Sequence, residues 1–246
     1  MSGHSKWSTI KRKKGANDAK RGKLFAKLIR AIEVAAKNGG PDPTNNASLY
    51  QAISKAKSMS VPNDNIEKAL KRLSGQQDGD DFEEVFYEGY APHGVAVLVE
   101  CLTDNRNRTS SDVKSTFSKY NGSTGAPGSV NYLFERKAVF YFDSLSEELV
   151  TIAIENSCLD FIETKEGVTF EFEPQDFTKI NEVFEKNNFK SSSAEVAYMS
   201  TNSIMLEVDQ FKTVSNLIEA LEDLDDIQNV YTNFDISENL IDDVIS

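Results

Sequence analysis

The chain has 246 residues, 39% of them hydrophobic and 27% charged, with a formal net charge of −12. Its length predicts two or three domains, and its composition is that of an ordinary soluble globular protein. No apolar run approaches the ~20 residues that span a bilayer, and no apolar stretch follows the basic N-terminus as in a secretory signal. We therefore expect a cytoplasmic protein that makes no membrane contact.

Positive charge is concentrated at the start of the chain. Residues 1–75 hold 16 Lys and Arg against five Asp and Glu, a net charge of +11, which leaves −23 for the remainder. Such asymmetry is typical of a basic nucleic-acid-binding module on an acidic body. The alternatives are chance surface charge and a polybasic contact with a membrane. The acidic body either orients the basic module by repelling nucleic acid or serves solvation alone.

The basic third of the chain is predicted to be helical. Apolar residues recur at helical spacing from Asp18 to Asn38, and the Gly-Gly-Pro sequence that follows ends this helix. Two more amphipathic helices are predicted at about 46–59 and from residue 63 or 64 to 73. Short helices of this kind bury their apolar stripes against one another, so we expect a small bundle. A mobile arm without apolar periodicity is expected over residues 1–15.

The basic arm and the outward face of the first helix form the main candidate site. Lys and Arg side chains neutralise phosphates and release condensed counterions, and about six such contacts to duplex DNA give a log K against log salt slope near −5. Trp7, the only tryptophan, either stacks on a base or anchors the arm in an apolar groove. The candidate nucleic-acid-binding residues here are Lys6, Trp7, Lys11, Arg12, Lys13, Lys14, Lys20, Arg21, Lys23, Lys27 and Arg30.

Beyond a polar linker at 74–81, the pattern changes to short strands and helices. Residues 136–200 follow the order strand-helix-strand-strand-helix-strand, which is the ferredoxin-like pattern. The elements after residue 200 lack partners of their own, so we expect them to complete the sheet that begins at residue 83. Outside 136–200, the predicted elements are strands at 83–90, 95–102, 130–134, 203–208 and 228–234, and helices at 106–119 and 211–224.

Together these elements predict an α+β protein. Its fold class is an N-terminal helical bundle followed by two ferredoxin-like α/β domains, the last inserted in the second. The expected domains are 1–75, the basic arm and three-helix domain; 82–135 plus 201–246, a discontinuous α/β domain; and 136–200, the inserted ferredoxin-like α/β domain.

A second candidate site lies in "CLTDNRNRTSSDV", residues 101–113. Arg106 and Arg108 come at the predicted start of a helix, where backbone N–H groups favour anions. They either contact a phosphate or pair with nearby acids beside a capped turn. The loop "NGSTGAPGS" at 121–129 has glycines that permit close approach of a ligand, although turns use the same residues.

Signals for an enzyme are poor. The two histidines, His4 and His93, are far apart in the sequence, and no Cys and His residues have metal-ligand spacing. Neither a phosphate-binding P-loop nor a nucleophile-elbow motif is present. We expect Cys101 and Cys158 to be reduced thiols in apolar surroundings. The prediction is a protein with no catalytic residues, no metal and no cofactor.

Four sequence blocks resemble the YebC/PmpR family. They are "GHSKW" with its continuation through residues 10–32, "VPNDNIEKALKR", "YEGYAPHGVAVLVECLTDNRNRT" and "GSVNYLFERK". The blocks occur in order over the first 140 residues, and the C-terminal part matches mainly in pattern. Ala91 and His93 stand where the family often has glycines, so any role of that turn in the family does not transfer here.

This resemblance implies an N-terminal helical domain and two α/β domains, the last inserted in the second. Bacterial members are generally described as cytoplasmic transcriptional regulators that bind DNA. Others are ribosome-associated translation factors that relieve stalling, and a mitochondrial relative activates translation of a cytochrome oxidase subunit. The resemblance implies no enzymatic activity.

The predicted function is therefore a nucleic-acid-binding regulator of gene expression, with duplex DNA or ribosomal RNA as target and the ribosome or the transcription machinery as further partner. Ribosomal RNA is the rival target because an unstructured basic arm suits irregular RNA, and no recognition helix with base-reading residues is evident. Two further alternatives are a protein-interaction adaptor whose basic module docks on an acidic partner, and an unrecognised enzyme.

Overall fold

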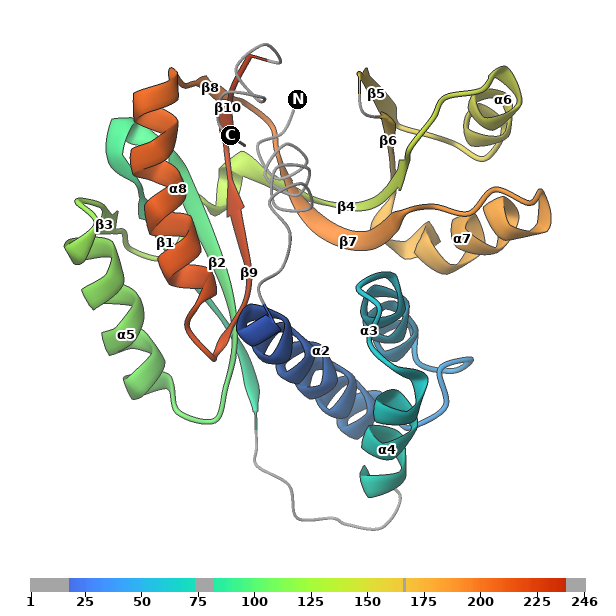
Figure 1. The fold of residues 1–246 in the computed structure, drawn as a ribbon, viewed down its shortest axis with the longest axis horizontal. Helices are drawn as coiled ribbons and strands as arrows, with labels where there is room; N and C mark the ends of the chain where they lie inside the picture. Colours follow the sequence, from blue (N-terminus) through green and yellow to red (C-terminus); the bar gives the residue numbers. More distant parts are fainter. Residues whose placement is uncertain (1–17, 74–81, 166, 238–246) are drawn as a thin grey trace. The chain divides into compact units, whose positions relative to one another are not determined.

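The computed structural model describes residues 18–73, 82–165 and 167–237. These residues form two compact units. The first contains residues 18–27, 82–135 and 198–237, and the second contains 28–73 and 136–197 apart from residue 166. Each unit has its own four-stranded sheet (Figure 1). Within the described ranges, no helix has both the length and the apolar character that crossing a membrane requires.

Three helices precede the first sheet, as predicted. The first of them ends at a glycine pair, and Gly40 has a φ of 92°, which lies in the left-handed region that favours glycine. Asn46 then joins the first two helices, because its side-chain amide donates to the carbonyls of Ala35 and Gly40 while its Oδ1 accepts from the N–H of Leu49. The helices are α2 (Asp18–Gly39), α3 (Ala47–Ser58) and α4 (Asn63–Leu73).

The expectation that these helices bury their apolar stripes only against one another is wrong for α3. The Tyr50 ring meets Phe177 edge-on, with 6.3 Å between ring centroids. Its hydroxyl accepts a hydrogen bond of 3.0 Å from Asn181 Nδ2, and Lys55 pairs with Glu195 at 2.8 Å. Helix α3 therefore packs on residues of the same unit that come about 130 residues later in the sequence.

The first unit is built on a sheet of order β3-β1-β2-β9. Strands β1 and β2 form a hairpin in which Tyr90 pairs with Ala96, and β9 returns from the C-terminal region to pair antiparallel with β2. Its elements are β1 (Glu83–Tyr90), β2 (Ala96–Thr103), α5 (Arg106–Lys119), β3 (Ser123–Thr124), α8 (Val208–Glu222) and β9 (Ile227–Thr232).

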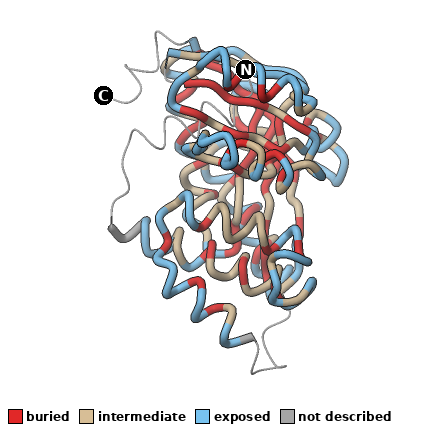
Figure 2. Tube along the Cα trace, turned by 90° about the vertical axis from the view of Figure 1, so that its right-hand side faces the viewer, coloured by how far each residue is buried: buried red, intermediate tan, exposed pale blue. Residues whose placement is uncertain are grey.

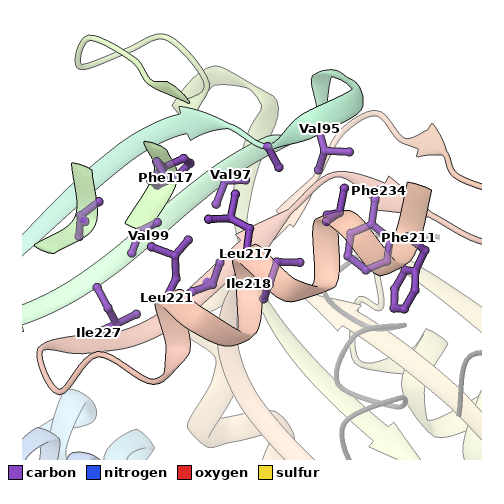
Figure 3. Packing of buried hydrophobic residues seen from close by; sticks show 14 of the residues in the cluster. Val95, Val97, Val99, Phe117, Phe211, Leu217, Ile218, Leu221, Ile227 and Phe234 are labelled. Carbon is purple, nitrogen blue, oxygen red and sulfur yellow. The ribbon is translucent and has the colours of Figure 1, made fainter. Parts of the chain in front are cut away.

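Helices α5 and α8 cover one face of this sheet (Figure 1). Val97 and Val99 alternate along β2 toward the helices, where they pack with Phe117 of α5 and with Leu217 and Leu221 of α8 (Figure 3). All five side chains are fully buried. This core places the N-terminus of α5 and the C-terminus of α8, where the candidate residues lie.

The second unit has the predicted strand-helix-strand-strand-helix-strand order, with its strands arranged β5-β6-β4-β7. Phenylalanines dominate its core; for example, the rings of Phe142 and Phe184 pack edge-on with centroids 4.9 Å apart. Buried stretches such as these are red in Figure 2. The elements are β4 (Phe134–Phe142), α6 (Glu147–Glu155), β5 (Asp160–Thr164), β6 (Gly167–Phe172), α7 (Phe177–Lys186) and β7 (Ser193–Ser200).

Two predicted strands of the first unit differ in the structure. Residues 131–133 form a short 3-10 turn, and the sheet takes Ser123–Thr124 as its edge strand instead. The cause is Glu88, whose carboxylate accepts the backbone N–H groups that a ladder at 128–131 would need. The strand expected near 203–208 is reduced to β8 (Ile204–Met205), which pairs with β10 (Phe234–Asp235) outside the four-stranded sheet.

Candidate nucleic-acid interface

The first described turns of α2 carry exposed cations. Arg21 and Lys23 are both exposed, and the Arg21 guanidinium lies over the Phe25 ring at 5.3 Å from its centroid. That contact covers the aromatic ring and leaves the charge at the surface. Lys23 lies near the acidic end of α8, with its Nζ 3.9 Å from Asp225 Oδ1. Such an exposed ion pair contributes little to stability, so both cations remain available to a phosphate.

Lys27 lies one turn further along the same helix and is placed differently. Only 9% of the residue is exposed, and its Nζ donates to the carbonyls of Glu222 and Leu224, at 2.6 Å each. The last carbonyls of a helix lack partners within the helix and carry partial negative charge. Lys27 therefore joins α2 to the C-terminus of α8, and the prediction that it belongs to the outward cationic face is wrong.

Arg108, at the start of α5, pairs with two acids, of which Asp226 is buried. Its Nη2 lies 2.8 Å from Asp226 Oδ2 and 2.7 Å from Asp104 Oδ1. The hydroxyls of Thr103 and Thr109 also donate to Asp226 Oδ2. Burial acts to raise the pKa of Asp226, but the hydrogen bonds from Arg108 and Thr109 outweigh it, and the net pKa lies below its usual value. Pairing with nearby acids, one of the two expectations for Arg108, is what the structure contains.

The N-terminus of α5 is already capped. The Asn105 side chain accepts the N–H of Arg108, which satisfies one of the helix's unpaired donors. Arg106 points to a different acid, with its Nε 3.5 Å from Glu83 Oε1, and its side chain is 64% exposed. Of the two arginines predicted here, Arg106 thus presents more of its charge to solvent.

The remaining predicted residues are placed as follows. Arg30 lies in the part of α2 that belongs to the second unit and is half-buried. Lys20 lies in α2, but its side chain is outside the described part. The arm residues Lys6, Trp7, Lys11, Arg12, Lys13 and Lys14 lie outside the described residues.

Helix α4 adds cations that were not among the predicted site residues. Lys68, Lys71 and Arg72 are all exposed, and the two charge pairs near them are loose: Lys71 lies 3.6 Å from Glu67, and Arg72 lies 3.7 Å from Glu33. The signal that could have identified them is the sequence "IEKALKR", in which helical spacing puts the cations opposite the apolar stripe. They place positive charge on the surface of the second unit.

We looked in the described ranges for metal-binding clusters and reactive thiols. No three His, Cys, Asp or Glu residues there are placed to hold a metal ion. Cys101 is buried, and burial followed by the charges of Asp226 and Glu100 raises its pKa to about 12. Burial also raises the pKa of Cys158 to about 11. Both thiols are therefore protonated and poorly nucleophilic at neutral pH.

Two family models of known proteins match consecutive parts of the chain. A family model described as "TACO1/YebC protein N-terminal domain" matches residues 5–76, and one described as "TACO1/YebC second and third domain" matches residues 82–234. A solved structure, of a conserved hypothetical protein from Aquifex aeolicus, is 43% identical, has a TM-score of 0.80, and is matched over 90% of this chain and 93% of its own.

Curated relatives match over almost the whole chain. One from Trichlorobacter lovleyi is 48% identical, over 96% of this chain and 97% of its own length. One from Geotalea uraniireducens is 49% identical, over 98% and 99%. Both are named probable transcriptional regulatory protein. With both family models in sequence order and a solved relative of the same fold, this chain belongs to the TACO1/YebC family.

Proposed function

We propose that this chain is a cytoplasmic, non-enzymatic regulator of gene expression that binds duplex DNA through its basic N-terminal region. The supporting observation is the separation of charge, a net of +11 over residues 1–75 against −23 over the rest. Exposed Arg21 and Lys23 on α2 continue the positive charge of the arm into the folded part of the chain. The relatives' name, probable transcriptional regulatory protein, agrees with this proposal.

In this proposal, the arm and the start of α2 hold phosphates by counterion release. The arm's Lys6, Lys11, Arg12, Lys13 and Lys14 supply most of the charge, and Trp7 accompanies them. The acidic α/β domains do not attract DNA, so they are free to contact proteins of the transcription machinery and to keep the DNA at the basic end. Of the three domains predicted from the sequence, the basic one binds DNA in this proposal and the two acidic ones contact proteins.

The test is a salt series of binding to labelled duplex DNA, followed by fluorescence anisotropy. Replacing Lys11, Arg12, Lys13 and Lys14 with alanine is expected to weaken binding and to make the log K against log salt slope shallower by up to about 3.6. The matched control replaces Lys165, Lys179, Lys186 and Lys190, four exposed lysines of the acidic body, and is expected to leave the slope unchanged. Equal effects of the two quadruple variants would contradict the proposal.

Competition separates the two nucleic acids. Unlabelled ribosomal RNA and unlabelled duplex DNA are added to the preformed complex at equal nucleotide concentration. The proposal expects the duplex to compete at least as well as the RNA. Displacement by ribosomal RNA at much lower concentration would assign the basic region to RNA and the protein to translation.

A further inference from the structure

Four segments of the chain without charged residues meet at one end of the first unit's sheet. Four segments of that unit, 89–99, 120–134, 198–206 and 227–234, contain no Asp, Glu, Lys or Arg, although 27% of the chain is charged. The other end of the same sheet holds Asp226, Arg108 and the acidic C-terminus of α8. The absence of charge is thus local and not a property of the whole unit.

The fold brings the four uncharged segments together. In the sheet, Tyr90 at the end of β1 pairs with both Ala96 and Ser123. The N–H of Thr201 donates to the carbonyl of Leu133 at 2.8 Å. Contacts of Asn233 complete the assembly, since its Nδ2 donates to Asn202 Oδ1 and its Oδ1 accepts from the N–H of Ala96.

The loop at this end is held in one conformation by a carboxylate. Glu88 is 9% exposed, and its two oxygens accept the backbone N–H groups of Gly128, Val130 and Asn131 at 2.6–2.8 Å. Burial acts to raise the pKa of Glu88, but these three bonds outweigh it and hold the pKa below its usual value. The carboxylate is therefore charged, and its charge is satisfied by the backbone N–H groups of the loop.

This arrangement displays an aromatic ring with polar neighbours. Tyr132 is 70% exposed, the highest value among the large hydrophobic side chains in the described ranges. Asn131 beside it in the chain is also exposed, as are residues 201–203 across the Thr201–Leu133 contact. We define the uncharged surface as Asn131, Tyr132, Thr201, Asn202 and Ser203.

We infer that the uncharged surface binds unpaired bases that lie next to the duplex whose phosphates bind the basic region. This inference rests on the proposed function and goes beyond it by naming what distinguishes one nucleic acid from another. Phosphate contacts position a protein but carry no sequence information, whereas base contacts do. Bases are recognised by aromatic stacking and by amide and hydroxyl groups on their edges, which are the groups displayed here.

The charge pattern favours bases over other occupants. A phosphate-binding surface would need cations, and the uncharged surface has none. On a body with a net charge of −23, a neutral region is where a nucleic-acid strand meets least repulsion. Bases inside a duplex are stacked on one another and leave no face for Tyr132, so the partner must present unpaired bases.

The test compares Tyr132→Ala with the unaltered chain on three labelled probes: a single strand, a hairpin with an unpaired loop, and a full duplex. We expect affinity for the first two to fall about 5- to 100-fold, with no change for the duplex. The salt slope should stay the same, because no phosphate contact is lost. Tyr132→Trp should retain binding, since it keeps a stacking face. Ile154→Ala, which trims another exposed apolar side chain, is the matched control.

A second variant tests the loop that carries the ring. Glu88→Gln removes one acceptor oxygen and the charge that hold residues 128–131, so it should weaken single-strand binding in the same direction as Tyr132→Ala. If the unaltered chain binds single strands and neither variant changes that affinity, the inference is overturned and the surface belongs to a protein partner. If the unaltered chain binds no nucleic acid, the proposed function is overturned as well.

Discussion

The two ends of the first unit's sheet use charge in opposite ways. At one end, Arg108 pairs with Asp226, and Lys27 binds carbonyls at the C-terminus of α8 and just beyond it, so those charges hold the fold together. At the other end, Glu88 is buried under a loop, and the uncharged surface displays the Tyr132 ring with amide and hydroxyl groups beside it. The difference teaches that the availability of a charge, and not its presence in the sequence, decides whether it can bind a ligand.

The largest effect on stability is expected at Asp226. Asp226→Ala leaves the Arg108 guanidinium without its buried partner and removes the acceptor of two buried hydroxyls, those of Thr103 and Thr109. We expect a loss of about 3 kcal/mol in the free energy of unfolding, measured by urea denaturation. Asp225→Ala is the control, because that side chain is 76% exposed; it should change stability by less than about 0.5 kcal/mol. Equal losses would contradict the assignment.

The next effect is expected at Lys27. Lys27→Met keeps the apolar stem but removes the ammonium that binds Glu222 and Leu224. Hydrogen bonds from charged groups contribute about 1.5–3 kcal/mol, so we expect a loss of about 2 kcal/mol in the free energy of unfolding. Lys23→Met, in an exposed pair, should cost less than about 0.5 kcal/mol. A larger loss for Lys23 than for Lys27 would refute the distinction between the two lysines.

Local sequence signals predict some of these features and miss others. Helix α2 and its end at Gly39 follow from local spacing and turn chemistry, and the ferredoxin-like order follows from alternating strands such as residues 168–172. Lys27 was placed wrongly because its partners lie about 195 residues away. The sequence predicts a strand at 130–134 because no local signal shows that the Glu88 carboxylate accepts the N–H groups of Val130 and Asn131. Long-range side-chain bonds therefore account for both errors.

A smaller effect, dependent on pH, is expected at Glu88. Its pKa in the folded chain lies below the ordinary value of 4.5, so its contribution to stability is present above pH 4.5 and is lost as the pH falls through the folded-state pKa. The free energy of unfolding should therefore decline on acidification, and Glu88→Gln should flatten that decline. The measurement is urea denaturation from about pH 3 to 7. An identical acid profile for the variant would contradict the role given to Glu88.

The central claim is that exposed cations bind nucleic acid, whereas cations bonded within the protein hold the fold together. The most direct measurement compares Lys27→Met with the double variant Arg21→Ala, Lys23→Ala. Duplex-DNA affinity is followed across a salt series for both, beside the unaltered chain. The account predicts that the double variant makes the log K against log salt slope shallower by about 1.8 at unchanged stability, while Lys27→Met lowers stability and leaves the slope unchanged. A shallower slope for Lys27→Met, with none for the double variant, would contradict it.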